Sequence, residues 1–110
     1  MNYGYVRVRN LSDEHVVERH SDLLRDLGAE KIIVETDGTQ FQSLLDILKP
    51  NDSLFIYSID RLSRKIDTLR KIFKRLSEKE VNLYAGKERI ELSGISAAIL
   101  FAEIDAQSRL

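Results

Sequence analysis

Residues 54–64 read Leu-Phe-Ile-Tyr-Ser-Ile-Asp-Arg-Leu-Ser-Arg, so an apolar run passes directly into a charged segment. The apolar run, residues 54–59, is typical of a strand that is covered on both faces of a sheet. After the charged segment, residues 65–79 have apolar side chains at helical spacing, with basic residues around them. A buried strand followed by an amphipathic helix is the repeating unit of a parallel α/β sheet.

The rest of the chain repeats this alternation. Strand-like patterns occupy residues 3–8, 31–35, 81–85 and 89–92, and helical patterns occupy residues 13–27, 41–48 and 94–110. Ser12 is placed to cap the first helix, and Gly28 follows its last turn. We therefore predict an α/β fold: a parallel-rich sheet of four to five strands, helices on both faces and a long C-terminal helix.

Composition excludes several classes of protein. The 110 residues suit one domain, 1–110, and the absence of cysteine excludes a disulfide scaffold, a thiolate metal site and a cysteine nucleophile. Seventeen basic and 18 acidic residues give a net charge of −1, so any anion site must be local. Since no segment has the pattern of a membrane span or a secretory signal, we predict a cytoplasmic protein without a membrane partner.

Arginines follow two of the predicted strands. Alternation along a strand places Arg7 and Arg9 on the same side, and Arg61 and Arg64 follow the apolar run. Sites in parallel α/β sheets form beyond the carboxyl ends of the strands. One interpretation of these arginines is a phosphate site, because guanidinium groups bind phosphate oxygens through paired hydrogen bonds. The alternative is that the arginines form ordinary surface ion pairs, with Asp60 orienting one of them.

Other chemistries find less support. His15 and His20 are five positions apart without a metal-ligand pattern, so we expect exposed helix histidines and no metal. The chain has no glycine-rich phosphate loop and no nucleophile elbow, and we interpret Gly38, Gly86 and Gly94 as turn residues.

The C-terminal segment, residues 94–110, is apolar around much of its circumference. Ile95 and Ile99 mark one face, whereas Leu100, Phe101 and Ile104 point elsewhere. Such a helix is either buried on several sides or meets another chain.

Several stretches together resemble the catalytic domain of the serine recombinases, the resolvase/invertase family. The family's opening strand, Gly-Tyr-Ala-Arg-Val-Ser, is similar to residues 4–9, Gly-Tyr-Val-Arg-Val-Arg, and its Asp-Arg-Leu-Gly-Arg motif is similar to residues 60–64. Residues 27–32 resemble the family's link into its second strand, 44–48 its Leu-Leu helix, and 102–103 the start of its Ala-Glu-x-Glu-Arg helix. The resemblance spans essentially the whole chain in order and spacing.

This resemblance implies a site-specific recombinase domain that exchanges DNA strands. In the family, a serine hydroxyl after the first strand attacks a backbone phosphate and forms a phosphoserine link, with no metal or nucleotide cofactor. Arginines stabilise the charge that develops in the transition state. The matching residues here are Arg7, Arg61 and Arg64, with Asp60 to hold an arginine in place. The resemblance also implies a homodimer or tetramer through residues 94–110.

Three positions depart from the family's pattern. Arg9 occupies the position of the nucleophilic serine, and a guanidinium cannot attack phosphorus. No Lys or Arg lies between Lys31 and Lys49, where the family has an arginine, and 105–106 read Asp-Ala in place of Glu-Arg. Each lost arginine would remove about 2.7–4 kcal/mol of transition-state stabilisation. We therefore predict a degenerate domain that has lost strand cleavage.

Two alternatives stay open. Ser12 is an alternative nucleophile if its loop brings it to the arginines, in place of its role as a helix cap. The fold could also serve as a non-catalytic regulatory or phosphate-binding module. No segment resembles the separate DNA-binding domain that family members carry, so we expect this chain to bind DNA weakly and with a steep dependence on salt.

Overall fold

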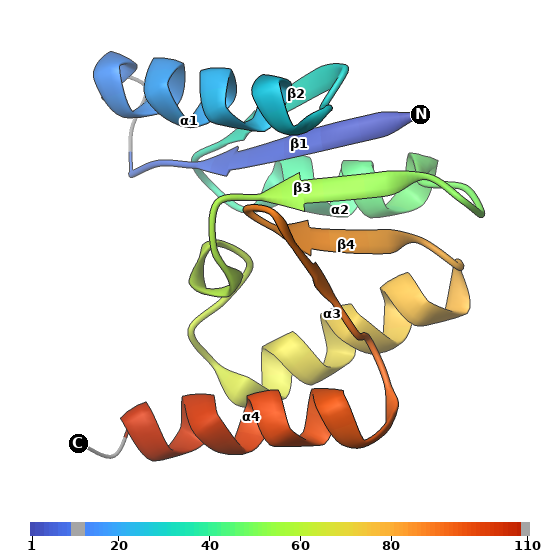
Figure 1. Ribbon diagram of the computed structural model, residues 1–110. Coiled ribbons are helices and arrows are strands. Elements are labelled where there is room, and N and C mark those ends of the chain that lie inside the picture. The colour runs from blue at the N-terminus through green and yellow to red at the C-terminus, as the bar shows by residue number, and fades with distance from the viewer. Residues whose placement is uncertain (10–12, 109–110) are drawn as a thin grey trace.

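The computed structural model describes residues 1–9 and 13–108, and strands and helices alternate along the chain as predicted (Figure 1). The strands are β1 (Asn2–Arg7), β2 (Lys31–Glu35), β3 (Ser53–Ile56), β4 (Asn82–Ala85) and β5 (Glu88–Ile90). The helices are α1 (Glu14–Leu27), α2 (Thr39–Ile47), α3 (Ile66–Glu78) and α4 (Gly94–Ser108), and a 3₁₀ turn spans Ile59–Arg61. The predicted α/β class is confirmed.

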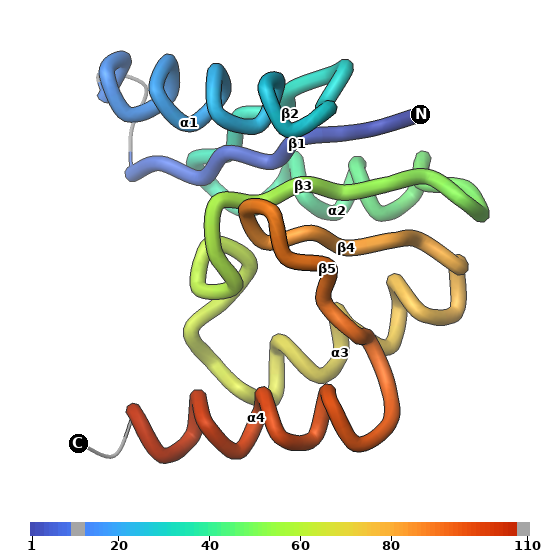
Figure 2. The backbone as a smooth tube through the Cα atoms, viewed as in Figure 1, coloured from blue at the N-terminus to red at the C-terminus, as the bar shows by residue number. Residues whose placement is uncertain are grey.

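The five strands form one sheet in the order β2-β1-β3-β4-β5. The first four are parallel, and β5 returns antiparallel to β4 through a turn at Gly86, whose φ is 59° (Figure 2). Tyr5 in β1 lies in register with Ile33 on one side and Ile56 on the other. Since β1 is flanked by β2 and β3, the carboxyl ends of these three strands meet at one edge of the sheet.

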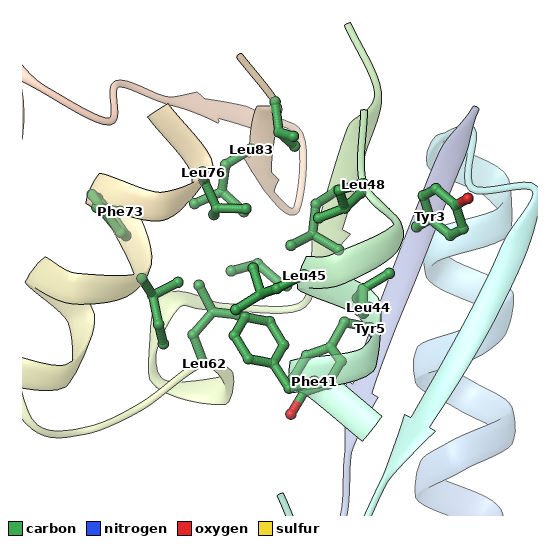
Figure 3. Packing of buried hydrophobic residues seen from close by; sticks show 14 of the residues in the cluster. Tyr3, Tyr5, Phe41, Leu44, Leu45, Leu48, Leu62, Phe73, Leu76 and Leu83 are labelled. Atoms are coloured by element: carbon green, nitrogen blue, oxygen red, sulfur yellow. The ribbon is translucent and has the colours of Figure 1, made fainter. Parts of the chain in front are cut away.

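Helices cover both faces of the sheet. Helix α1 packs on one face, and α2 and α3 pack on the other (Figure 1). The larger core lies between the sheet, α2 and α3, where the ring centroids of Tyr5 and Phe41 are 4.9 Å apart (Figure 3). On the α1 side of the sheet, a Cβ at Gly4 would lie 2.6 Å from Cδ1 of Ile32 in β2 and 3.2 Å from Cδ1 of Leu24 in α1, so glycine in β1 lets both side chains pack closely over the strand.

Helix α4 lies against α3, on the side of α3 away from the sheet (Figure 1). Ala97 is buried, and the Phe101 ring contacts the Phe73 ring with centroids 5.0 Å apart. Ile95 and Ile99 point outward and are 80% and 54% exposed. The helix is therefore covered on one side, not on several. In the described part of the chain, no helix is both long and apolar enough to cross a membrane.

Two expectations about local structure are wrong. The strand predicted over residues 54–59 ends at Ile56, because the chain turns into the 3₁₀ turn through a hydrogen bond from the Arg61 N–H to the Ser58 carbonyl (3.0 Å). His20 was expected to be exposed, yet it is buried at 9% exposure because its ring stacks on Tyr57; His15 is exposed as expected. Ser12, the expected helix cap, lies outside the described residues.

Candidate functional site

An open pocket of about 510 Å³ lies at the carboxyl ends of β1 and β3. It is lined by Arg7, Val8, Arg9, Thr36, Asp60, Arg61, Ser63, Arg64 and Lys65. We call it the arginine pocket. The structure therefore brings together all four arginines selected from the sequence, and Asp60 with them. The remaining candidate, Ser12, lies outside the described residues.

The end of β1 supplies one wall of the arginine pocket. Arg7 and Arg9 are exposed, while Val8 between them is buried, as strand alternation requires. The pairing of β1 with β2 continues one residue beyond β1, because the Val8 N–H donates to the Glu35 carbonyl at 3.0 Å. This bond holds the two arginines on one side of the chain as it leaves the sheet.

The 3₁₀ turn supplies the opposite wall. Its backbone is closed by a hydrogen bond from Leu62 N–H to the Ile59 carbonyl (3.0 Å), and the buried Leu62 side chain anchors it in the core (Figure 3). The Ser58 hydroxyl donates to the Asp60 carboxylate. Arg61, the last residue of the turn, and Arg64, three residues further on, thus lie on either side of a buried leucine that ties this segment to the core.

The cations of the arginine pocket form no ion pair with any residue that the structure describes. Five cationic side chains and one carboxylate line it. The three ion pairs found among residues 1–9 and 13–108 all lie elsewhere, and Asp60 is engaged by Ser58, not by an arginine. The alternative of arginines held in ordinary surface ion pairs is therefore not observed in the described chain. A concentration of unpaired guanidinium groups is suited to binding an oxyanion.

Glu35, at the end of β2, is a residue that the sequence analysis missed. Its side chain is fully buried, with Oε1 accepting from Phe41 N–H (2.8 Å) and Oε2 from Thr36 N–H (3.0 Å). The residue preceding α2 is Gly38, which has no side chain to cap the helix, so the carboxylate of Glu35 accepts from Phe41 N–H and that of Asp37 accepts from Thr39 N–H. Burial, and then the charge of Glu35, raises the pKa of Tyr5 above its ordinary value, although Arg7 lowers it.

His20 and Tyr57 were also missed. Their rings stack with centroids 4.1 Å apart and an interplanar angle of 3°, and Cζ of Arg61 lies 5.9 Å from the centroid of the Tyr57 ring. Burial, followed by the charges of Arg61 and Arg19, lowers the pKa of His20 below its ordinary value. The spacing of His20 and Leu24, one helical turn apart on the buried face of α1, was the available signal.

Among the described residues there is no group of three or more His, Cys, Asp or Glu side chains that could hold a metal ion. Two hydroxyl groups line the arginine pocket, those of Thr36 and Ser63. Ser63 Oγ accepts a hydrogen bond from Lys65 N–H at 3.0 Å, which closes a local turn. The arrangement can bind an anion through several guanidinium groups.

Comparison with known proteins agrees with this architecture. The family described as "Resolvase, N terminal domain" matches residues 2–109. The chain is 30% identical over 95 residues to the transposon Tn501 resolvase of Pseudomonas aeruginosa, covering 83% of this chain and 50% of that protein. It is 27% identical over 99 residues to the transposon Tn917 resolvase of Enterococcus faecalis, covering 84% and 53%. The chain spans about half the length of the curated relatives it matches.

Proposed function

This chain belongs to the family of resolvase N-terminal domains, and from that premise we propose that it is the catalytic-type domain of a site-specific DNA recombinase. In this proposal the arginine pocket holds a phosphate group of the DNA backbone. The observation that carries the proposal is the set of five cations gathered in one pocket without ion-pair partners in the described chain. We infer that it acts on DNA in the cytoplasm.

Arg9 gives the proposal its particular form. Its position in the family's opening motif is that of the nucleophilic serine, and here it adds a fifth cation to the pocket in place of a hydroxyl. The exchange favours phosphate binding and removes the group that would attack phosphorus. We propose a domain that binds the DNA backbone and does not cut it, and so serves as a regulatory or accessory partner.

Binding by the arginine pocket can be tested with a labelled DNA duplex and fluorescence anisotropy over a series of salt concentrations. Arg61→Ala should weaken binding roughly tenfold, as expected for a charged hydrogen bond, and should reduce the slope of log affinity against log salt by about 1. Arg89→Ala is the matched control, because Arg89 lies on β5, outside the arginine pocket, and donates to Asn82 (3.2 Å). Equal effects of the two substitutions would contradict a phosphate site in the pocket.

Loss of cleavage has a separate test. A pool of nicked half-site duplexes, randomised around the nick, should give no covalent adduct with the wild-type chain on a denaturing gel. An adduct that Ser12→Ala abolishes would overturn the proposal in favour of an active recombinase that uses Ser12. Mapping the adduct by mass spectrometry would distinguish Ser12 from Thr36 and Ser63, the two hydroxyl residues of the arginine pocket.

Self-association through residues 94–110 completes the proposal. The outward face of α4 carries Ile95 and Ile99, both largely exposed, on the side opposite to its contact with α3. We expect a concentration-dependent dimer or tetramer in sedimentation velocity, which Ile99→Asp should dissociate. Ser96→Asp adds the same charge at a polar position of the same helix and should leave it intact. A wild-type chain that stays monomeric at high concentration would contradict this assembly.

A further inference from the structure

Three side chains connect α1 with the arginine pocket. His20 comes from α1, Tyr57 follows β3, and Arg61 ends the 3₁₀ turn. The His20 and Tyr57 rings lie nearly parallel with centroids 4.1 Å apart, and the Arg61 guanidinium lies over the same Tyr57 ring, 5.9 Å from its centroid. The imidazole, phenol and guanidinium groups therefore form one contiguous set at the edge of the pocket.

Arg61 differs from the other cations of the pocket. It is half-buried, whereas Arg7, Arg9, Arg64 and Lys65 are exposed. Its Nε is buried and has no hydrogen-bond partner within the described residues. Because Nε faces away from solvent, the Nη groups are the donors that Arg61 can offer to a phosphate.

Something other than a carboxylate must orient this guanidinium. Asp60, the expected partner, accepts a hydrogen bond from Ser58 and makes no ion pair with Arg61 in the described structure. The Tyr57 ring is the group over which Arg61 lies, and a cation above an aromatic face is attracted by the negative charge density of the ring. Tyr57 is itself 45% exposed, so its own position depends on the contact with buried His20.

We propose that Tyr57 is a positioning residue for Arg61, and that His20 holds Tyr57 in place by stacking on it. The pair fixes the guanidinium before a phosphate arrives, so that less conformational freedom is lost on binding. The proposal deepens the function inferred above and rests on it, because it assigns a role to Tyr57 only through the phosphate donor Arg61.

The protonation state of the His20 imidazole agrees with this role. The charged groups that act on its ring are Arg19, on the same helix, and Arg61, from the 3₁₀ turn, and both are positive. With burial they lower the pKa of His20, so the ring is neutral at neutral pH. Protonation of His20 in acid would place a second positive charge within the set, beside Arg61 and near Arg19, and would weaken the hold on Arg61.

Arginine Nε–Hε signals in a ¹⁵N NMR spectrum test the positioning directly. In the wild-type chain the Arg61 signal should be shifted by the ring current of Tyr57 and protected from solvent exchange relative to Arg64. Tyr57→Leu should abolish both properties, and Tyr57→Phe, which keeps the ring, should retain them. In the wild-type chain, protonation of His20 at acidic pH should reduce both properties of the Arg61 signal. His20→Phe should keep both properties and make them independent of pH. His15→Ala, at an exposed site on the same helix, is the matched control and should behave as the wild type does.

Binding of a short DNA duplex at low salt gives the second readout. Tyr57→Leu should weaken binding about two- to fivefold, the range expected for a partly exposed cation–π contact, and Tyr57→Phe should restore it. An Arg61 signal that is unchanged in Tyr57→Leu would overturn the positioning role. If the wild-type duplex titration shifts no arginine of the pocket, the phosphate-binding function fails, and the unbound spectra still decide whether Tyr57 positions Arg61.

Discussion

At the amino ends of β1 and β3, charged groups are paired with partners from the chain. Asp52 accepts hydrogen bonds from the Met1 ammonium group (2.8 Å) and from Lys49 N–H (2.9 Å), and Glu30 accepts from Asn2 N–H (2.8 Å). At the carboxyl ends of the same strands, the cations of the arginine pocket form no ion pair among the described residues. One edge of the sheet uses charge to hold the chain together, and the other leaves charge available to a ligand.

The difference has an energetic consequence. Like charges in one pocket repel each other, so the carboxyl edge lowers the stability of the folded chain, while the paired amino edge raises it. Residues kept for binding at a cost in stability are a common feature of functional sites. Removing a cation of the arginine pocket and removing a paired group of the amino edge should therefore change the free energy of unfolding in opposite directions.

Glu35 should give the largest effect, because it lies at the carboxyl edge and yet is buried and hydrogen-bonded. Glu35→Ala leaves two backbone N–H groups without an acceptor and should lower the free energy of unfolding by about 2–4 kcal/mol. Urea denaturation followed by circular dichroism measures this. Glu30→Ala, at an exposed carboxylate with a single backbone bond, is the control and should cost less than about 1 kcal/mol. Similar losses in both variants would show that Glu35 does not cap α2.

Asp52 should give the next largest effect and a dependence on pH. The hydrogen bond from the Met1 ammonium group, assisted by that from Lys49 N–H, lowers the pKa of Asp52 below its ordinary value of 3.8. Asp52→Asn should lower the free energy of unfolding by about 1–3 kcal/mol at neutral pH.

The sign of the pH effect follows from that lowered pKa. The stabilisation by Asp52 is complete above the pKa of the unfolded chain and is lost as the pH falls through the lower pKa of the folded chain. The wild-type and Asp52→Asn stabilities should therefore converge in acid. A constant difference between them down to the most acidic pH would mean that ionised Asp52 is not the stabilising species.

The layout of the fold could be predicted from the sequence because its strands are apolar runs and its helices are amphipathic. Residues 31–35 form β2 as predicted, because the apolar triplet at residues 32–34 is too short for a helix and is typical of a buried strand. The end of β3 could not be predicted in this way. Tyr57 and Ile59 continue the apolar pattern, and only the backbone bonds of the 3₁₀ turn show that the strand has already ended.

The candidate site was predictable where single residues carry its chemistry. Strand alternation and the Asp-Arg-Leu-x-Arg pattern were enough to select the arginines that the structure places around one pocket. Glu35 and the His20–Tyr57 pair depend on contacts between elements that are distant in the sequence. A glutamate at the end of a strand, such as Glu35, is typically exposed to solvent. No neighbouring residue in the sequence indicates that Phe41 N–H will donate to its carboxylate. The catalytic assignments of Arg7, Arg61, Arg64 and Asp60 stay predictions.

Arg9 should give the smallest change in stability, and the sign of that change is the sharpest test of the comparison. Arg9→Ser removes one of the repelling cations and should raise the free energy of unfolding by about 0.2–0.5 kcal/mol at low salt, the size of a like-charge contact at a surface. High salt should erase the gain, because screening removes repulsion between exposed charges. Arg89→Ser, which removes a cation of β5 that is hydrogen-bonded to Asn82 of β4, should give no gain. If Arg9→Ser lowers the free energy of unfolding at every salt concentration, Arg9 stabilises the fold. The claim that repulsion among the pocket cations destabilises the carboxyl edge would then be wrong.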